Sequence, residues 1–168
     1  MLKTLLVAGL LAAAAAPALA QTTAPAATPP CQEPERRQFD FWVGNWDVYP
    51  TGQDVLVARS TIEKLYGGCA VRENWKPLKG NGGGSLNAWR PDEKGWRQTW
   101  LDSSGTWAEF RGGWTGTSIV IQGDWGGTLT RMTYTPAADG TVRQFGETSA
   151  DKGATWKPTF DLTYRRAR

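Results

Sequence analysis

The most informative absence in this 168-residue sequence is histidine, of which there is none. Without histidine the chain cannot assemble a Ser-His-Asp or Cys-His catalytic triad. It also has no imidazole to offer as a ligand to zinc or haem. Any proton transfer would have to use Asp, Glu, Lys or Tyr. The sequence therefore predicts no metal site and no cofactor.

Long apolar runs are also missing once the first twenty residues are set aside. Residues 1–20 combine a basic Lys3, the apolar run LLVAGLLAAAAA and the small-residue sequence ALA, which ends at Ala20. This pattern is typical of a signal peptide cleaved near Ala20. No later stretch is apolar enough to cross a bilayer. We therefore expect an exported protein, periplasmic or secreted, without a transmembrane segment.

Cysteine is scarce, and both cysteines lie in the part expected to be exported. Residues 21–34 are rich in Ala, Thr and Pro and are predicted to form a disordered linker, ahead of a single domain at residues 35–168. In an oxidising compartment, Cys31 and Cys69 favour one disulfide that ties this linker to the domain. Two separate buried thiols are the alternative.

Excess charge of one sign is lacking as well. The formal net charge is +3, and the basic residues are scattered except for YRRAR at the C-terminus. A nucleic-acid-binding protein would concentrate them on one face or along one element. We therefore expect no nucleic-acid partner, and nothing in the sequence indicates an oligomeric state.

What the domain does contain is a regular series of turn signals separating short segments rich in Trp, Tyr, Phe, Val, Ile and Thr. Nine turns leave ten segments, and no window of helical length shows an apolar stripe of period 3.6. Within the segments apolar residues alternate with polar ones, as in CAVRENWK at 69–76, which is typical of strands with one buried face. The turn signals lie at residues 50–54, 66–68, 77–84, 91–95, 102–105, 115–118, 123–127, 136–140 and 149–156.

These features predict an all-β fold, an up-and-down antiparallel β-barrel of about ten strands. A barrel is favoured over a sandwich because short sequential hairpins provide no long crossover, and because closure removes exposed sheet edges. A one-turn helix is expected around residues 33–38, before the first strand. The glycine-rich GNGGGS at 80–85 lacks the features of a phosphate loop and is expected to form a loop at the barrel mouth.

The stretch QFDFWVGNWDVYP, at residues 38–50, contains a G-x-W sequence at Gly44-Asn45-Trp46. This resembles the first signature of lipocalins and other calycins. The resemblance implies that Trp46 closes one end of the barrel and that a basic residue of the last strand, Arg165 or Arg166, packs over its ring. Residues Phe39, Phe41 and Val43 are then expected to form the first inward-facing stripe.

The wider sequence is similar to a family of uncharacterised secreted bacterial proteins with a lipocalin-like barrel. The similarity is carried in order by FDFWVGNWDV, GGCAVRENW, GGGSLNAW, WRQTWLDSSG and FDLTY. It covers nearly all of residues 35–168 and implies a calycin fold, but no particular activity. Haem binding in nitrobindin-type calycins uses a histidine, so that property is not carried over.

The sequence SADKGATW at 149–156 matches the S-x-D-x-G-x-x-W pattern of the Asp-box found in sialidases. A single copy in so short a domain does not indicate a sialidase. We expect it to form the last hairpin turn, in which Asp151 accepts backbone N–H groups, Gly153 adopts a positive φ and Trp156 folds back onto the sheet.

Glu73 is the most unusual residue, because it shares the predicted apolar face with Val71 and Trp75. A carboxyl group in that position has to be paired, hydrogen-bonded or protonated. One hypothesis is a polar floor in an aromatic cavity; the alternative is a structural network, for instance an ion pair between Glu73 and Arg131. Likewise, the ten tryptophans could fill the core or line a pocket. The candidate ligand-binding residues are Glu73, Trp75, Trp89, Gln98, Trp100, Asp102, Glu109 and Arg131.

The function best supported by the sequence is binding of a small, largely apolar or aromatic molecule inside the barrel. A second possibility is a metal-free isomerase- or lyase-type enzyme in which Glu73, Glu109 or Asp102 acts as acid or base. A third is a filled barrel that interacts only through its outer surface. A cavity lined by Glu73 and Trp100 would favour the first two.

Overall fold

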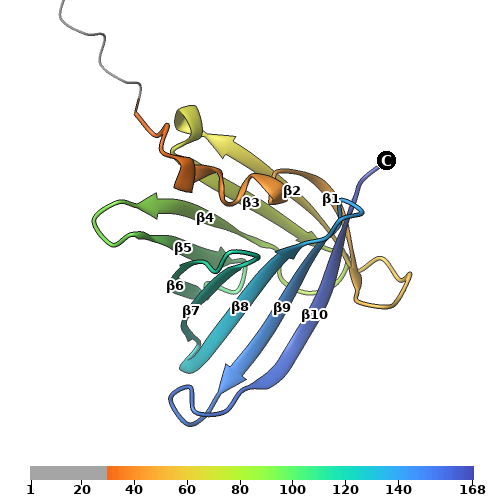
Figure 1. Cartoon of the computed structure of the whole chain (residues 1–168). Helices are drawn as coiled ribbons and strands as arrows, with labels where there is room; N and C mark the ends of the chain where they lie inside the picture. Colours follow the sequence, from red (N-terminus) through yellow and green to blue (C-terminus); the bar gives the residue numbers. More distant parts are fainter. Residues whose placement is uncertain (1–29) are drawn as a thin grey trace, which may run out of the picture.

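The computed structural model describes residues 30–168, and ten strands form one closed antiparallel barrel (Figure 1). Each strand pairs with its neighbours in the sequence, and β1 pairs with β10 to close the sheet. This confirms the predicted up-and-down barrel. The predicted signal peptide and residues 21–29 of the predicted linker lie outside the described residues. The strands are β1 Gly44–Pro50, β2 Ala58–Leu65, β3 Ala70–Pro77, β4 Gly83–Arg90, β5 Gly95–Asp102, β6 Trp107–Trp114, β7 Ile119–Trp125, β8 Thr128–Pro136, β9 Val142–Ser149 and β10 Lys157–Arg166.

The strands follow the alternation in the sequence. In β3, Val71 and Glu73 are buried and face the interior, whereas Arg72 and Asn74 are exposed on the outer surface. A period of two places successive side chains on opposite faces of a strand, so each strand with one apolar face buries that face in the barrel. The other buried strand residues have the same origin, and the largest fully buried side chains among them are Trp46, Trp96, Tyr134, Tyr164 and Phe110.

Three single-turn 3-10 helices complete the fold: η1 Pro34–Arg37, η2 Asp40–Trp42 and η3 Tyr66–Gly68. The helix η1 confirms the turn expected at residues 33–38. The prediction that Phe39, Phe41 and Val43 form the first inward-facing stripe was wrong, because only Phe39 of the three is fully buried, and because η1 and η2 precede β1. They lie across one end of the barrel (orange in Figure 1).

The aromatic rings of this N-terminal segment close that end of the barrel from inside. Phe39 and Trp42 are fully buried. The ring of Phe39 lies 4.9 Å from that of Trp96, and the ring of Trp42 lies 4.8 Å from that of Tyr134, measured between centroids. The segment therefore acts as a plug, and we call residues 34–42 the N-terminal plug.

Trp46 joins this plug to the wall of the barrel. Its indole Nε1 donates to the Trp42 carbonyl oxygen at 2.7 Å, and the guanidinium of Arg166 lies 4.0 Å from its ring centroid. Of the two arginines expected to cover Trp46, Arg166 does so, whereas Arg165 lies over Tyr49. Gly44 is required beside them, because its φ is +145° and a Cβ there would lie 1.8 Å from Arg166 Nη1.

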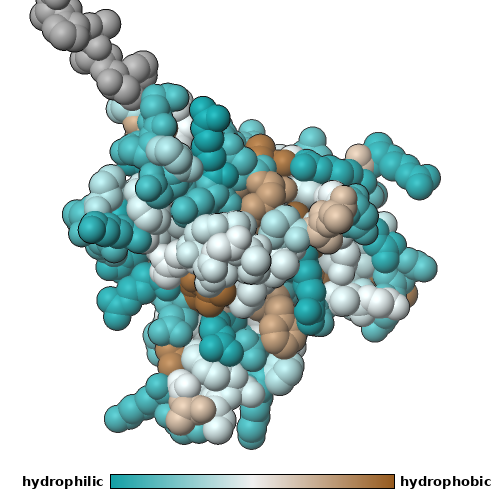
Figure 2. Space-filling model, in the orientation of Figure 1, coloured by the Kyte–Doolittle hydropathy of each residue, from teal (hydrophilic) through white to brown (hydrophobic). Residues whose placement is uncertain are grey.

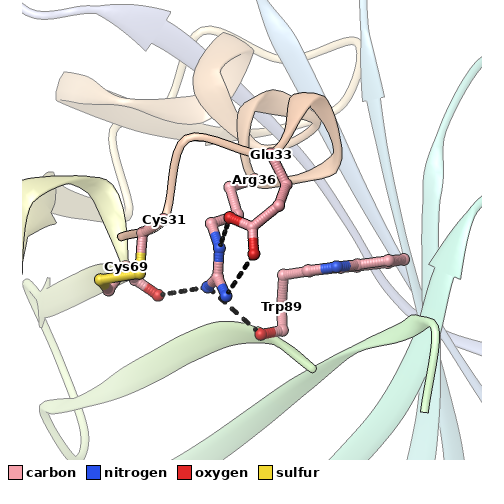
Figure 3. Close-up of a disulfide and its surroundings, with 5 residues drawn as sticks. All are labelled: Cys31, Glu33, Arg36, Cys69 and Trp89. Carbon is pink, nitrogen blue, oxygen red and sulfur yellow. Dashed lines mark hydrogen bonds and ion pairs between the residues drawn. A yellow bond between two sulfur atoms is a disulfide. The ribbon is translucent and has the colours of Figure 1, made fainter. Parts of the chain in front are cut away.

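The disulfide between Cys31 and Cys69 forms as predicted and fastens the chain ahead of η1 to the start of β3. Arg36 reinforces this attachment (Figure 3). Its guanidinium pairs with Glu33 at 2.6 Å and also donates to the backbone carbonyls of Cys69 and Trp89. A buried arginine that has an acidic partner and two carbonyl acceptors is well compensated. The disulfide and Arg36 together hold the N-terminal plug against β3 and β4.

The Asp-box sequence forms the turn between β9 and β10. The Asp151 carboxylate accepts hydrogen bonds from Ser149 Oγ at 2.7 Å and from the Thr155 backbone N–H at 2.8 Å. Gly153 has a φ of +94°, and Trp156 Nε1 donates to its carbonyl oxygen. These contacts are all local, so the motif serves as a hairpin turn.

Polar and hydrophobic side chains both reach the outer surface, and the exposed large hydrophobic residues are Val55, Tyr66, Leu78, Leu86, Leu101, Trp107 and Trp114. Figure 2 shows one face of the molecule, on which hydrophilic side chains predominate and the hydrophobic areas between them are small. Over residues 30–168, no helix has the length and apolar character needed to cross a membrane.

Candidate functional site

A cavity of about 310 Å³ occupies the barrel interior. Asn81, in the loop between β3 and β4, and Trp125, at the end of β7, both line it. The cavity therefore lies toward the end of the barrel opposite the N-terminal plug, and the glycine-rich loop lies at its mouth. Its lining residues are Glu73, Trp75, Asn81, Gln98, Trp100, Asp102, Phe110, Trp125, Met132, Tyr134, Gln144, Phe160, Leu162 and Tyr164.

Aromatic rings form much of the cavity wall, and seven of the fourteen lining residues are Trp, Tyr or Phe. The ring of Trp125 contacts those of Trp100 and Phe110 at centroid distances of 5.9 and 6.0 Å. Across the cavity, Trp75 lies 6.3 Å from Tyr164. Each of these pairs joins residues from different strands, so the barrel curvature brings the rings around one space.

Glu73 lies in the deeper part of the cavity, among hydroxyl groups from three other strands. Only 4% of its surface is exposed. Oε1 accepts a hydrogen bond from Ser60 Oγ at 3.1 Å and lies 3.4 Å from the Tyr164 hydroxyl, while Oε2 accepts one from Ser85 Oγ at 3.2 Å. Strand register explains this arrangement, because Glu73 is paired directly with Ser85 on β4, and Ser60 on β2 is two residues from its partner Ile62.

Burial raises the pKa of Glu73 to about 7, because the charged form loses its hydration. The hydrogen bonds from Ser60 and Ser85 oppose this effect without cancelling it. None of the ion pairs among residues 30–168 includes Glu73. A carboxyl group with this pKa exists in both protonation states near neutral pH, which is unusual for glutamate.

A chain of hydrogen bonds continues from Glu73 across the barrel. The Tyr164 hydroxyl lies 2.6 Å from Gln144 Oε1 but 3.4 Å from Glu73 Oε1. A phenol has one proton, and the shorter contact takes it. Tyr164 can then accept the proton of a neutral Glu73, and Gln144 Nε2 donates in turn to the Tyr134 hydroxyl at 3.1 Å. The network thus fits a protonated Glu73.

The side chain of Gln98 donates to this network at Tyr134 and, among residues 30–168, leaves its carbonyl oxygen as a free hydrogen-bond acceptor. Asn87 Nδ2 donates to the Val71 carbonyl oxygen at 3.0 Å, which fixes the orientation of the Asn87 amide. Gln98 Nε2 must therefore be the group that donates to Asn87 Oδ1, at 2.8 Å. The Gln98 carbonyl oxygen accepts no hydrogen bond from residues 30–168 and remains available to a ligand.

Trp100 and Asp102 lie on the cavity wall nearer its mouth. The buried Trp100 indole N–H has no hydrogen-bond partner among residues 30–168. Asp102 accepts hydrogen bonds from the Ser104 hydroxyl and backbone N–H, and the hydroxyl bond above all lowers the pKa of its carboxyl group. The Trp100 side chain also lowers the pKa of Asp102, because its indole N–H lies near the carboxylate, although the two groups do not form a hydrogen bond. The mouth of the cavity therefore carries a negative charge.

The cavity brings together five of the eight candidate ligand-binding residues, namely Glu73, Trp75, Gln98, Trp100 and Asp102. The other three lie outside it. Trp89 packs against Trp96, and its carbonyl oxygen accepts the hydrogen bond from Arg36. Glu109 is exposed on β6.

Arg131 forms an ion pair with Glu147 at 2.8 Å and lies over the Trp156 ring. An ion pair between Glu73 and Arg131 therefore does not form, and the network around Glu73 consists of hydroxyl and amide groups instead.

The sequence reasoning missed three residues that complete this network: Tyr134, Gln144 and Tyr164. Their signal was present in the alternation of the last three strands. Tyr134 shares a face of β8 with Met132, and Gln144 lies on the buried face of β9. A polar residue on a predicted inward face is the pattern that singled out Glu73, and it applies equally to Gln144.

Within residues 30–168, no group of three or more Cys, Asp and Glu side chains is placed to hold a metal ion. No protein-family model matches this chain, and no curated protein is significantly similar to it. The closed ten-strand barrel is consistent with a calycin fold, whereas membership of the secreted bacterial family stays a prediction.

Proposed function

We propose that this protein binds a small, largely apolar or aromatic molecule inside the barrel. The observation that carries the proposal is the 310 Å³ cavity with aromatic walls and one deeply buried, hydrogen-bonded carboxyl group. Binding sites for small molecules combine apolar walls with a few fixed polar groups in this way. The proposal includes export, with which the Cys31–Cys69 disulfide is compatible.

The proposal is tested by titration with N-phenyl-1-naphthylamine, an uncharged dye that fluoresces in apolar surroundings. Leu162 lines the cavity, so Leu162→Trp narrows it; Leu86, on the exposed face of β4, provides the matched control Leu86→Trp. We expect saturable binding to the wild type and to Leu86→Trp, with affinity at least about tenfold weaker for Leu162→Trp. Equal affinity in all three proteins, or no saturable binding, would contradict the proposal.

Native mass spectrometry of protein purified from its own source gives an independent readout. We expect the spectra of the wild type and of Leu86→Trp to show the added mass of one bound ligand per protein molecule. This added mass should be absent from Leu162→Trp. The co-purified mass would identify the ligand directly.

A second candidate function is an isomerase- or lyase-type enzyme, favoured by the pKa of Glu73, which lies near neutral pH. A group with such a pKa can give and take a proton without a metal or a histidine. Incubation of the co-purified molecule with fresh protein, followed by NMR, would show whether it is converted. Conversion that is absent in Glu73→Gln would establish the enzyme; an unchanged spectrum would leave a binding protein.

A further inference from the structure

The charged groups that line the cavity are all of one sign. Among the fourteen lining residues, Glu73 and Asp102 are the only ones of type Asp, Glu, Lys or Arg. This is notable in a chain whose Lys and Arg residues outnumber its Asp and Glu residues by 19 to 16. The basic residues lie elsewhere, so an anionic ligand would meet two carboxyl groups and no cation.

Glu73 also lacks the partner that a buried carboxylate ordinarily has. Its hydrogen-bond partners, Ser60, Ser85 and Tyr164, carry no charge. Buried carboxylates in proteins are usually paired with a cation because desolvation of an isolated charge is costly. In residues 30–168 that cation is missing, and Glu73 borders a space large enough to admit one from outside.

The walls of the cavity are suited to the same kind of group. Trp75 and Tyr164 lie beside Glu73, and Trp100, Phe110 and Trp125 enclose the remaining space. The face of an aromatic ring attracts ammonium groups, most strongly for Trp. Two independent features, the unpaired carboxyl and the surrounding rings, therefore favour a positive charge.

From these contacts we infer that the cavity binds a ligand with an amine or quaternary ammonium head group on an aromatic or apolar body. The head group lies against Glu73, and the body packs against the rings of Trp100 and Trp125 that line the cavity. This inference rests on the proposed function and adds the charge and chemical class of the ligand.

Binding of such a cation displaces the proton of Glu73. The O–H bond of the carboxyl group breaks, the proton passes to solvent, and the ammonium group replaces it as the partner of the carboxylate; no covalent bond forms. The other titratable cavity groups are Tyr164 on β10, Tyr134 on β8 and Asp102 on β5. The pKa of each tyrosine is raised well above its ordinary value and that of Asp102 is lowered, so none of them titrates between pH 5 and 8.

The test compares ligands that differ only in their head group. Isothermal titration calorimetry at pH 8 would measure tryptamine, tryptophol and indole-3-acetate, and the smaller series 2-phenylethylamine, 2-phenylethanol and phenylacetate. Within each series we expect the amine to bind at least about tenfold more tightly than the alcohol, and the acid to bind most weakly. In Glu73→Gln, which keeps the side-chain shape without the charge, this preference for the amine over the alcohol should disappear. The matched variant Glu109→Gln, altered on the exposed outer face, should behave as the wild type.

A second measurement uses the wild type alone and does not depend on how the variant folds. Because the pKa of Glu73 is about 7, amine affinity should weaken about tenfold between pH 8 and pH 6, and calorimetry in buffers of different ionisation enthalpy should show about 0.9 proton released per amine bound at pH 6. Alcohol affinity should be independent of pH. An affinity for the amine that is constant from pH 6 to pH 8 would overturn the inference.

The outcomes separate the two proposals. If the dye binds in the cavity but alcohols or acids bind as tightly as amines, the inference about charge is wrong and the proposed function stands. The inference is also wrong if Glu73→Gln retains the preference for amines. If neither the dye nor any member of the two series binds, the proposed function fails and the inference fails with it.

Discussion

Replacing Glu73 with Gln should change how the stability of the protein depends on pH. The absence of histidine makes this effect unusually clear, because no imidazole titrates between pH 5 and 8. Asp102, Asp151 and Asp161 are among the carboxyl groups whose pKa is lowered, and they titrate below this range. Among residues 30–168, we therefore expect Glu73 to account for most of the change in stability between pH 5 and pH 8.

The magnitude follows from the pKa of Glu73, which rises from an ordinary value of 4.5 to about 7 in the folded chain. The folded state thus binds this proton more tightly than the unfolded state. The contribution of Glu73 to the free energy of unfolding is therefore highest below pH 4.5, falls as the pH rises from 4.5 to 7, and then levels off. At about 1.4 kcal/mol for each pKa unit, the wild type should lose about 2 to 3 kcal/mol between pH 5 and pH 8.

Urea denaturation at half-unit intervals from pH 5 to pH 8 would measure this loss. The curve for Glu73→Gln should be nearly flat, so the variant gains stability relative to the wild type as the pH rises. Glu109→Gln makes the same chemical change on the outer surface and should keep the wild-type slope. A flat wild-type curve, or an equal slope in Glu73→Gln, would show that burial does not hold the proton on Glu73.

Two further predictions concern the closed end of the barrel. The double variant Cys31→Ser/Cys69→Ser should unfold at a lower temperature, by an amount corresponding to at most about 4 kcal/mol, because the disulfide closes a loop with a sequence separation of 38 residues; reductant should lower the melting temperature of the wild type but not that of the variant. Gly44→Ala should cost about 1 to 3 kcal/mol in urea denaturation, because the new Cβ displaces Arg166 from Trp46 and forces a positive φ on alanine. Gly113→Ala is the matched control, since a Cβ there meets no atom within 4 Å, and an equal loss in both variants would contradict the explanation.

The barrel could be predicted because its signals are local. Turn residues at nine positions set the strand number, and alternation of period two set which face of each strand is buried. In an up-and-down barrel each strand pairs with its sequence neighbours, so a correct series of hairpins gives most of the topology. The pairing of β1 with β10 then follows from the need to remove two exposed edges.

The stretch at residues 39–43 was assigned incorrectly because two periodicities overlap in it. Phe39, Phe41 and Val43 alternate as in a strand, whereas Phe39 and Trp42, three residues apart, match a helical turn. The structure uses the second spacing, and Phe39 and Trp42 are both fully buried. Five residues are too few for either pattern to be decisive, and the shape of the barrel end determines which is adopted.

The sequence by itself determined the strand count and the buried position of Glu73, and it favoured a Cys31–Cys69 disulfide without excluding two separate thiols. Each of these depends on residues within one strand or on composition. Only the tertiary structure decided what surrounds Glu73, since Ser60, Ser85 and Tyr164 come from three different strands. It also decided that Arg131 turns outward to Glu147 and leaves the buried carboxyl group without a cation. Strand alternation specifies which face a side chain occupies, but its partners across the barrel depend on the tilt and stagger of the strands, which no local pattern encodes.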